Sequence, residues 1–183
     1  MDTTRIWTYD DLVRLPDDGK RYEILDGDLV VSPSPTRTHQ VALERIAHVF
    51  RRRLLERGIA HVFVVPLDTI LSPQRVVVPD MTVVRRERQE IIKERGLEGP
   101  PDLAIEVMSS RPSLDRVRKF RLYAKTGIAE YWLVDPIGKT IEVYVLDDGD
   151  YHLIGYYGDG EVARSALFDV SIAIDAVFAD FKL

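Results

Sequence analysis

The chain has 183 residues, of which 45% are hydrophobic and 30% charged, a composition that fits one globular domain with a sizeable core. It contains no cysteine, so disulfides, thiolate zinc sites and cysteine nucleophiles are excluded. The four histidines form no HExxH motif or close pair, and any metal is therefore expected to be a hard cation on oxygen ligands. The net charge of −5 counts against avid nonspecific binding to duplex DNA, because such binding depends on Lys and Arg contacts to phosphate.

Two features of the chain bear on its location. No apolar stretch approaches the roughly 20 residues that a membrane-spanning helix needs. The segment Met1–Leu15 is acidic and lacks the basic and apolar regions of a secretory signal. We therefore expect a cytoplasmic protein without a membrane partner, forming a single domain over residues 1–183.

The N-terminal segment predicts a short helix followed by a β-hairpin. The helix covers about Tyr9–Leu15, with Thr8 as its N-cap. Strands at Tyr22–Leu25 and Leu29–Ser32 flank Asp26-Gly27-Asp28, which is typical of a hairpin turn.

The longest predicted helix covers about Thr38–Arg57 and ends at Gly58. Its apolar residues repeat at helical spacing and are expected to form one buried stripe. They are Leu43, Ile46, Phe50 and Leu54.

The rest of the chain alternates strands and helices, which predicts an α/β fold with a mixed β-sheet flanked by helices on both sides. The expected strands are Ala60–Val65, Asp68–Leu71, Val76–Val84, Asp102–Met108 and Glu130–Val134. Arg85–Gly99 is expected to be partly helical, and Ser113–Thr126 is expected to form a helix that ends at Gly127. Thr140–Leu146, Tyr151–Tyr157 and a short helix near Asp175–Phe178 predict a C-terminal β-meander with a cap.

Asp80 lies within the apolar run Val76–Val84. Strand alternation would place it on the face of Val78 and Thr82, where burying a charge is costly unless the charge is paired or bound to metal. Pro79 has no amide N–H, which indicates a strand edge, bend or bulge beside the acid.

Glu106 repeats this pattern in the next predicted strand. It shares a face with the small Ala104, which leaves room for a ligand, while the alternate positions are apolar. Two carboxylates on separate strands favour a hard divalent cation, completed by water and a substrate phosphate. The alternative for each acid is an ion pair with an arginine or a role as a turn cap.

The helix Ser113–Thr126 places Asp115, Lys119 and Tyr123 along one flank at i, i+4 and i+8. The residues expected to face the core are Leu114, Val117, Phe120 and Ala124. A lysine beside the two acids would orient the attacking water or neutralise a phosphate. From spacing alone, however, Asp115 and Lys119 are better explained as a surface ion pair.

Several short motifs, each weak alone, occur in order along nearly the whole chain. They are Arg21-Tyr22-Glu23-Ile24-Leu25-Asp26-Gly27, His39-Gln40, Val78-Pro79-Asp80, Pro101–Ser109, Asp115–Lys119, Tyr123 and Gly127–Pro136. In this combination the sequence resembles the Uma-two family of restriction-endonuclease-like proteins, a branch of the PD-(D/E)XK superfamily.

The resemblance implies a restriction-endonuclease-like core with Asp80 as the first acid and Glu106 as the second. The superfamily lysine would fall at Met108, which carries no charge, and in this branch Lys119 is the matching position. Glu23 matches an N-terminal acid that joins the metal shell in related nucleases. The implied catalytic residues are therefore Asp80, Glu106, Lys119 and Glu23, with Mg²⁺ on the three acids and Mn²⁺ as a substitute.

Other residues are candidates for the surroundings of this site. For His39, a core or capping role competes with a place at the site edge, where Asp115 and Tyr123 are the other candidates. The best local basic surface for a nucleic-acid backbone comprises Arg116, Arg118 and Arg121.

We therefore expect a metal-dependent nuclease that hydrolyses phosphodiester bonds of nucleic acid, with DNA as the favoured substrate. A homodimer is expected, since two symmetry-related sites cut both strands most simply. Two alternatives stay open: a nuclease-derived binding or interaction domain without turnover, and a metal-dependent hydrolase of a small phosphorylated substrate. The lack of a strongly basic surface favours these alternatives, whereas the joint presence of the four site residues favours catalysis.

Overall fold

The computed structural model describes residues 5–32, 34–64, 66–108 and 114–179, with side chains in the last range from residue 116 onward. Four sequence expectations fall outside these parts: the strand end at Val65, the helix start at Ser113 and the side chains of Leu114 and Asp115. None of the helices in the described ranges is both long and apolar enough to cross a membrane.

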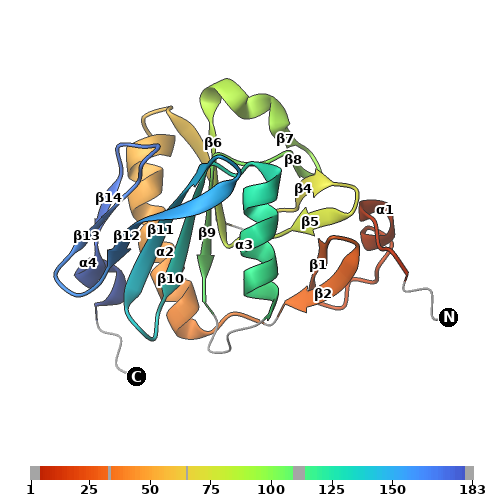
Figure 1. Cartoon of the computed structure of the whole chain (residues 1–183), viewed down its shortest axis with the longest axis horizontal. Helices are drawn as coiled ribbons and strands as arrows, with labels where there is room; N and C mark the ends of the chain where they lie inside the picture. The colour runs from red at the N-terminus through yellow and green to blue at the C-terminus, as the bar shows by residue number, and fades with distance from the viewer. Residues whose placement is uncertain (1–4, 33, 65, 109–113, 180–183) are drawn as a thin grey trace.

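The described ranges form four α-helices and three β-sheets (Figure 1). The helices are α1 (Tyr9–Leu12), α2 (Arg37–Phe50), α3 (Leu114–Thr126) and α4 (Ile174–Phe178). The main sheet has the order β12-β11-β10-β9-β6-β3, and a second sheet has the order β2-β1-β5-β4-β8-β7, while β13 and β14 form a separate pair. The main-sheet strands are β3 (Ala60–Phe63), β6 (Met81–Arg85), β9 (Leu103–Val107), β10 (Glu130–Asp135), β11 (Thr140–Asp147) and β12 (Asp150–Tyr157). The others are β1 (Arg21–Leu25), β2 (Asp28–Ser32), β4 (Thr69–Ser72), β5 (Arg75–Val77), β7 (Ile92–Lys93), β8 (Gly96–Glu98), β13 (Val162–Arg164) and β14 (Ser171–Ala173).

The main sheet is mixed, as expected. Strands β9 and β10 run parallel and are joined through α3, whereas β10, β11 and β12 form the predicted antiparallel meander. A parallel pair needs such a crossover, because its strands start at the same end of the sheet.

The N-terminal hairpin forms where the sequence predicts it. Strands β1 and β2 pair from Arg21 opposite Ser32 to Leu25 opposite Asp28. The turn residues Asp26 and Gly27 have φ angles of 51° and 89°, the left-handed pair that a two-residue hairpin turn requires.

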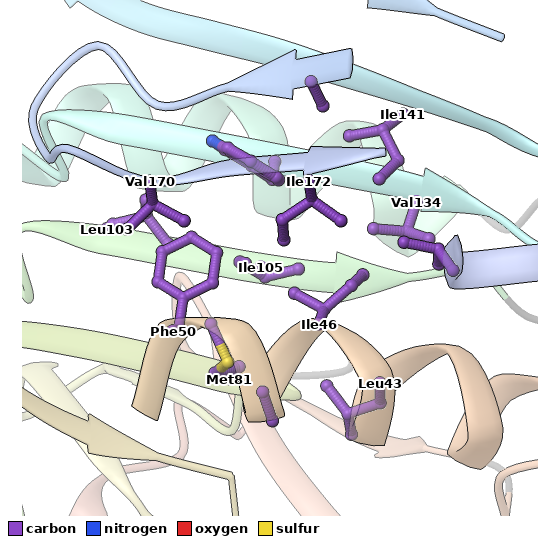
Figure 2. Close-up of a cluster of buried hydrophobic side chains, with 14 of the residues drawn as sticks. Leu43, Ile46, Phe50, Met81, Leu103, Ile105, Val134, Ile141, Val170 and Ile172 are labelled. Carbon is purple, nitrogen blue, oxygen red and sulfur yellow. The ribbon is translucent and has the colours of Figure 1, made fainter. Parts of the chain in front are cut away.

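Helix α2 begins after Thr36, whose hydroxyl accepts the backbone N–H of His39. The helix continues through a π-helical turn, Arg51–Leu55, before the chain reverses at Gly58, where φ is 66°. Its predicted stripe is buried and packs on the main sheet, with Ile46 and Phe50 facing Leu103 and Ile105 of β9 (Figure 2).

Helices α2 and α3 cover opposite faces of the main sheet (Figure 1). Leu103 and Ile105 belong to the core cluster beneath α2, whereas Ala104 of the same strand belongs to the cluster with Tyr123 of α3. This alternation places the Glu106 side of β9 on the α3 face, as the sequence indicates.

Two details of the prediction were wrong. Val76–Val84 is not one strand, since β5 ends at Val77 in the second sheet and β6 starts at Met81 in the main sheet. Helix α3 is also rotated relative to expectation: Val117 is half exposed and Tyr123 is fully buried, although Ala124 is buried and Phe120 packs against the core as expected. The rotation follows from the polar contacts of α3, because Lys119 turns inward to reach Glu23 and Glu106, and Tyr123 turns inward to reach Glu106.

Replacing Phe50 with Ala is expected to lower the free energy of unfolding by about 3–5 kcal/mol, because the ring is fully buried and its loss leaves a cavity against Trp132. The matched change Val117→Ala on the exposed side of α3 is expected to cost no more than about 0.5 kcal/mol. Urea unfolding of both variants measures the difference. Similar losses in the two proteins would contradict the assignment of the core.

Candidate active site

Asp80 sits at the point where the chain passes from the second sheet to the main sheet. Pro79 precedes it and donates no backbone hydrogen bond, so the strand pairing is interrupted there. The side chain is buried, and its Oδ2 atom accepts the backbone N–H of Val107 at 2.9 Å, at the end of β9. The bend indicated by Pro79 therefore turns the carboxylate toward the strand that carries Glu106.

The other oxygen of Asp80 faces two basic side chains. Oδ1 lies 3.5 Å from Nη1 of Arg21 and 3.2 Å from Nε2 of His39, although the His39 contact lacks hydrogen-bond geometry. Burial alone would raise the pKa of Asp80, but the His39 contact, the Val107 N–H and the charge of Lys119 outweigh it and lower the pKa below its ordinary value. Asp80 is therefore held as a carboxylate, and an arginine is one of its partners.

Glu23 joins the same region from strand β1. Its Oε1 atom accepts the backbone N–H of Val78 at 2.8 Å and lies 2.7 Å from Nζ of Lys119, while its Oε2 atom accepts the hydroxyl of Ser32 at 2.6 Å. The residue is only 1% exposed. A carboxylate this deeply buried needs such a complete set of donors.

Glu106 is bound by two side chains from α3. Its Oε1 atom accepts from Nζ of Lys119 at 2.9 Å and from the hydroxyl of Tyr123 at 2.6 Å. Lys119 and Tyr123 are one helical turn apart, so they reach the same carboxylate. Tyr131 packs edge-on against Tyr123, with ring centroids 5.5 Å apart, and holds that ring in place. Lys119 therefore bridges Glu23 and Glu106 and is not a surface residue.

Burial and the neighbouring charges raise the pKa values of both Glu106 and Lys119. Burial, followed by repulsion from Asp80 and Glu23, raises the pKa of Glu106 to about 7 despite the attraction of Lys119. For Lys119, burial would lower the pKa, but the charges of Glu106 and Glu23 outweigh it and raise the pKa above its usual value. Lys119 thus stays protonated, whereas the ionisation of Glu106 requires more free energy than that of an ordinary glutamate.

The donor set suits a hard divalent cation in chemistry and charge. Three carboxylates, those of Glu23, Asp80 and Glu106, gather around the single ammonium group of Lys119. No three His, Asp or Glu side chains in the described ranges converge closely enough to hold an ion by themselves. A hard divalent cation held here would take one or two of these carboxylates and complete its shell with other oxygen ligands.

Two of the residues predicted at the edge of the site contact this cluster. His39 contacts Asp80, and Tyr123 contacts Glu106, whereas the side chain of Asp115 lies outside the described parts. Met108 packs in the apolar cluster beneath α3, as a residue without charge can.

The three arginines of α3 differ in their contacts. Arg118 donates to the backbone oxygen of Leu25 and to Asp28, both at 2.7 Å, so it links α3 to the hairpin. Arg116 lies 3.9 Å from Glu142, and Arg121 is exposed.

Two contact residues were missed by sequence reasoning, Arg21 beside Asp80 and Ser32 beside Glu23. A signal for both was present. Arg21 and Glu23 alternate on one face of β1, and Ser32 is the cross-strand partner of Arg21.

Comparison with known proteins gives a family and a fold. The model of the Uma2 family, described as "Putative restriction endonuclease", matches residues 9–176. A solved structure from Anabaena variabilis, described as "a putative nuclease belonging to DUF820", superimposes with a TM-score of 0.76 at 22% sequence identity, covering 94% of this chain and 97% of that chain. The search of curated proteins found no match.

The raised pKa of Glu106 predicts a pH-dependent stability that Glu106→Gln removes. Between the ordinary value of 4.5 and the folded value of about 7, the folded state binds more protons than the unfolded state. Stability from this residue is therefore complete below pH 4.5 and is lost as the pH rises through 7, by on the order of 3 kcal/mol. Urea unfolding in EDTA at pH 5 and pH 8 is expected to show a smaller loss for Glu106→Gln than for the wild type. An equal loss in both would show that Glu106 ionises normally.

Proposed function

We propose a nuclease function for this chain, because it belongs to the Uma2 family, whose description is "Putative restriction endonuclease". In this proposal it is a metal-dependent nuclease that hydrolyses phosphodiester bonds of nucleic acid, with DNA as its substrate. The observation that carries the proposal is the convergence of Glu23, Glu106 and Lys119 within 2.9 Å contacts, next to the buried Asp80. A buried cluster with perturbed pKa values is the usual mark of a functional site.

Asp80 and Glu106 are the residues that would hold Mg²⁺, or Mn²⁺ in its place, with Glu23 as a further acid. When bound, such an ion supplies an acidified water and offsets charge on the phosphate. In the described parts of the chain, Oε2 of Glu106 has no hydrogen-bond partner and Oδ1 of Asp80 has only its two longer contacts. Within these parts, Glu106 thus keeps an oxygen atom for a ligand, whereas a ligand at Oδ1 of Asp80 would share that atom with Arg21 and His39.

Lys119 acts in this proposal as a positive charge and hydrogen-bond donor. Its pKa is raised, so it does not accept a proton from water near neutral pH. Held by Glu23 and Glu106, the ammonium group is positioned to orient a water molecule or to stabilise negative charge on a phosphate oxygen. Tyr123 and Ser32 position the acids by donating to Glu106 and Glu23 respectively.

One observation favours the alternative of a nuclease-derived domain without turnover. Arg21 already lies beside Asp80, and Lys119 already lies between the two glutamates, so the cluster is partly neutralised by its own cations. The cleavage and metal-binding experiments below separate a working nuclease from such a domain.

Purified protein is expected to cut plasmid DNA with Mg²⁺ or Mn²⁺, and Asp80→Asn, Glu106→Gln and Lys119→Met are each expected to lower the rate roughly 100-fold or more. Each change removes one charge from the cluster with little change in side-chain size. Gel quantification of nicked and linear plasmid over time gives the rates.

Two matched variants control this comparison. Asp102 is a buried acid bound by Arg85 N–H and Arg88, outside the cluster, so Asp102→Asn tests the loss of a structural carboxylate. Lys125→Met removes an exposed lysine from the same helix as Lys119. Both are expected to keep the wild-type rate, and cleavage that persists in every cluster variant would refute the assignment.

Metal binding is expected to stabilise the folded protein even when no substrate is present. At about 100 times its Kd, Mn²⁺ should raise the Tm by on the order of 5–10 °C. Asp80→Ala is expected to abolish the rise, whereas Asp102→Asn should keep it. A rise that survives Asp80→Ala would place the ion elsewhere, and a rise without cleavage of any nucleic acid would favour the domain without turnover.

A further inference from the structure

A surface pocket of about 670 Å³ lies beside the hairpin β1–β2, between the segment after α1 and the loop before α2. Its volume is in the range of pockets that hold one small organic molecule. Much of its wall is apolar, from residues that lie far apart in sequence: Leu12, Leu15, Pro16, Val31 and Pro66.

Three residues join this pocket directly to the acid cluster. Arg21 lines the pocket and places Nη1 3.5 Å from Asp80. Ser32 and Val78 also line it, and both donate hydrogen bonds to Glu23. A molecule in the pocket would therefore lie next to the place where a scissile phosphate must sit.

The lining combines the three contacts that a nucleotide uses. Arg21 supplies a guanidinium for phosphate, and the apolar wall together with the ring of Tyr22 supplies a surface for a flat base. Asp68, a half-buried acid in the lining, supplies an acceptor for the amino group of a base.

We propose that this pocket binds a single unpaired nucleotide of the substrate strand, adjacent to the phosphodiester that is cut. The inference rests on the proposed nuclease function and names its substrate class. A base inside the pocket has left the helical stack, which costs least in single-stranded or locally unpaired nucleic acid. The enzyme therefore acts on single strands, overhangs or flaps in preference to intact duplex.

The test is direct binding in EDTA, where no turnover is needed. The probe is a fluorescein-labelled ten-nucleotide DNA strand of mixed sequence, used either alone or annealed to its complement. An RNA strand of the same sequence distinguishes DNA from RNA as the source of the nucleotide. Fluorescence anisotropy is expected to show roughly tenfold tighter binding of a single strand than of the duplex.

Filling the pocket is expected to abolish that preference. Val31 is half exposed on β2, so Val31→Trp occupies the pocket without disturbing the core, and Leu15→Trp fills it from a second lining residue. Each is expected to weaken single-strand binding about tenfold or more. Leu153→Trp, at a half-exposed position on β12 that does not line the pocket, is the matched control and should bind as the wild type does.

Unchanged single-strand binding by both filled variants, or equal binding of duplex and single strand by the wild type, would overturn the pocket assignment. The failure of the nuclease proposal looks different: no Mn²⁺-induced rise in Tm and no cleavage of any strand, whatever the binding result. Cleavage of the single strand that continues at the wild-type rate in Val31→Trp would refute the pocket alone.

Discussion

The contact of one lysine with two glutamates, one buried and one partly buried, holds this site together. Lys119 comes from α3, Glu106 from the main sheet and Glu23 from the second sheet, so a single ammonium group connects three parts of the chain. Burying two carboxylates requires a compensating charge, and burying a lysine requires acceptors. The orientation of α3, with Val117 outside and Tyr123 inside, is the consequence.

The break between β5 and β6 supplies the second constraint. Because Val77 ends one sheet and Met81 begins the other, the three residues between them lie at the junction of the two sheets. Both ends of this junction are used: the Val78 N–H binds Glu23, and the Asp80 carboxylate binds the Val107 N–H. The hairpin thereby contributes an acid, an arginine and a pocket wall to a site whose other acids are Asp80 at the junction and Glu106 in the main sheet.

The net charge of −5 counts less against a polyanionic substrate than it does when the sequence is taken alone. Some of the acidic side chains are buried in the cluster, where they are paired, and so do not face a polyanionic substrate. Of the arginines on α3, Arg118 is tied to the hairpin, which leaves a modest basic surface. The proposed recognition of a short unpaired segment would need fewer phosphate contacts than wrapping duplex DNA does.

The sequence by itself determined the order of the elements, the hairpin turn at Asp26-Gly27, the buried stripe of α2 and the alternation that separates Glu106 from Leu103 and Ile105 on β9. These features follow from local periodicity and turn chemistry, which neighbouring residues carry. Only the tertiary structure decided that Val76–Val84 divides between two sheets, that Lys119 turns inward, and that Arg21 and Ser32 join the cluster. These outcomes depend on which charges become buried together, and local sequence does not encode the burial of a charge by residues far along the chain.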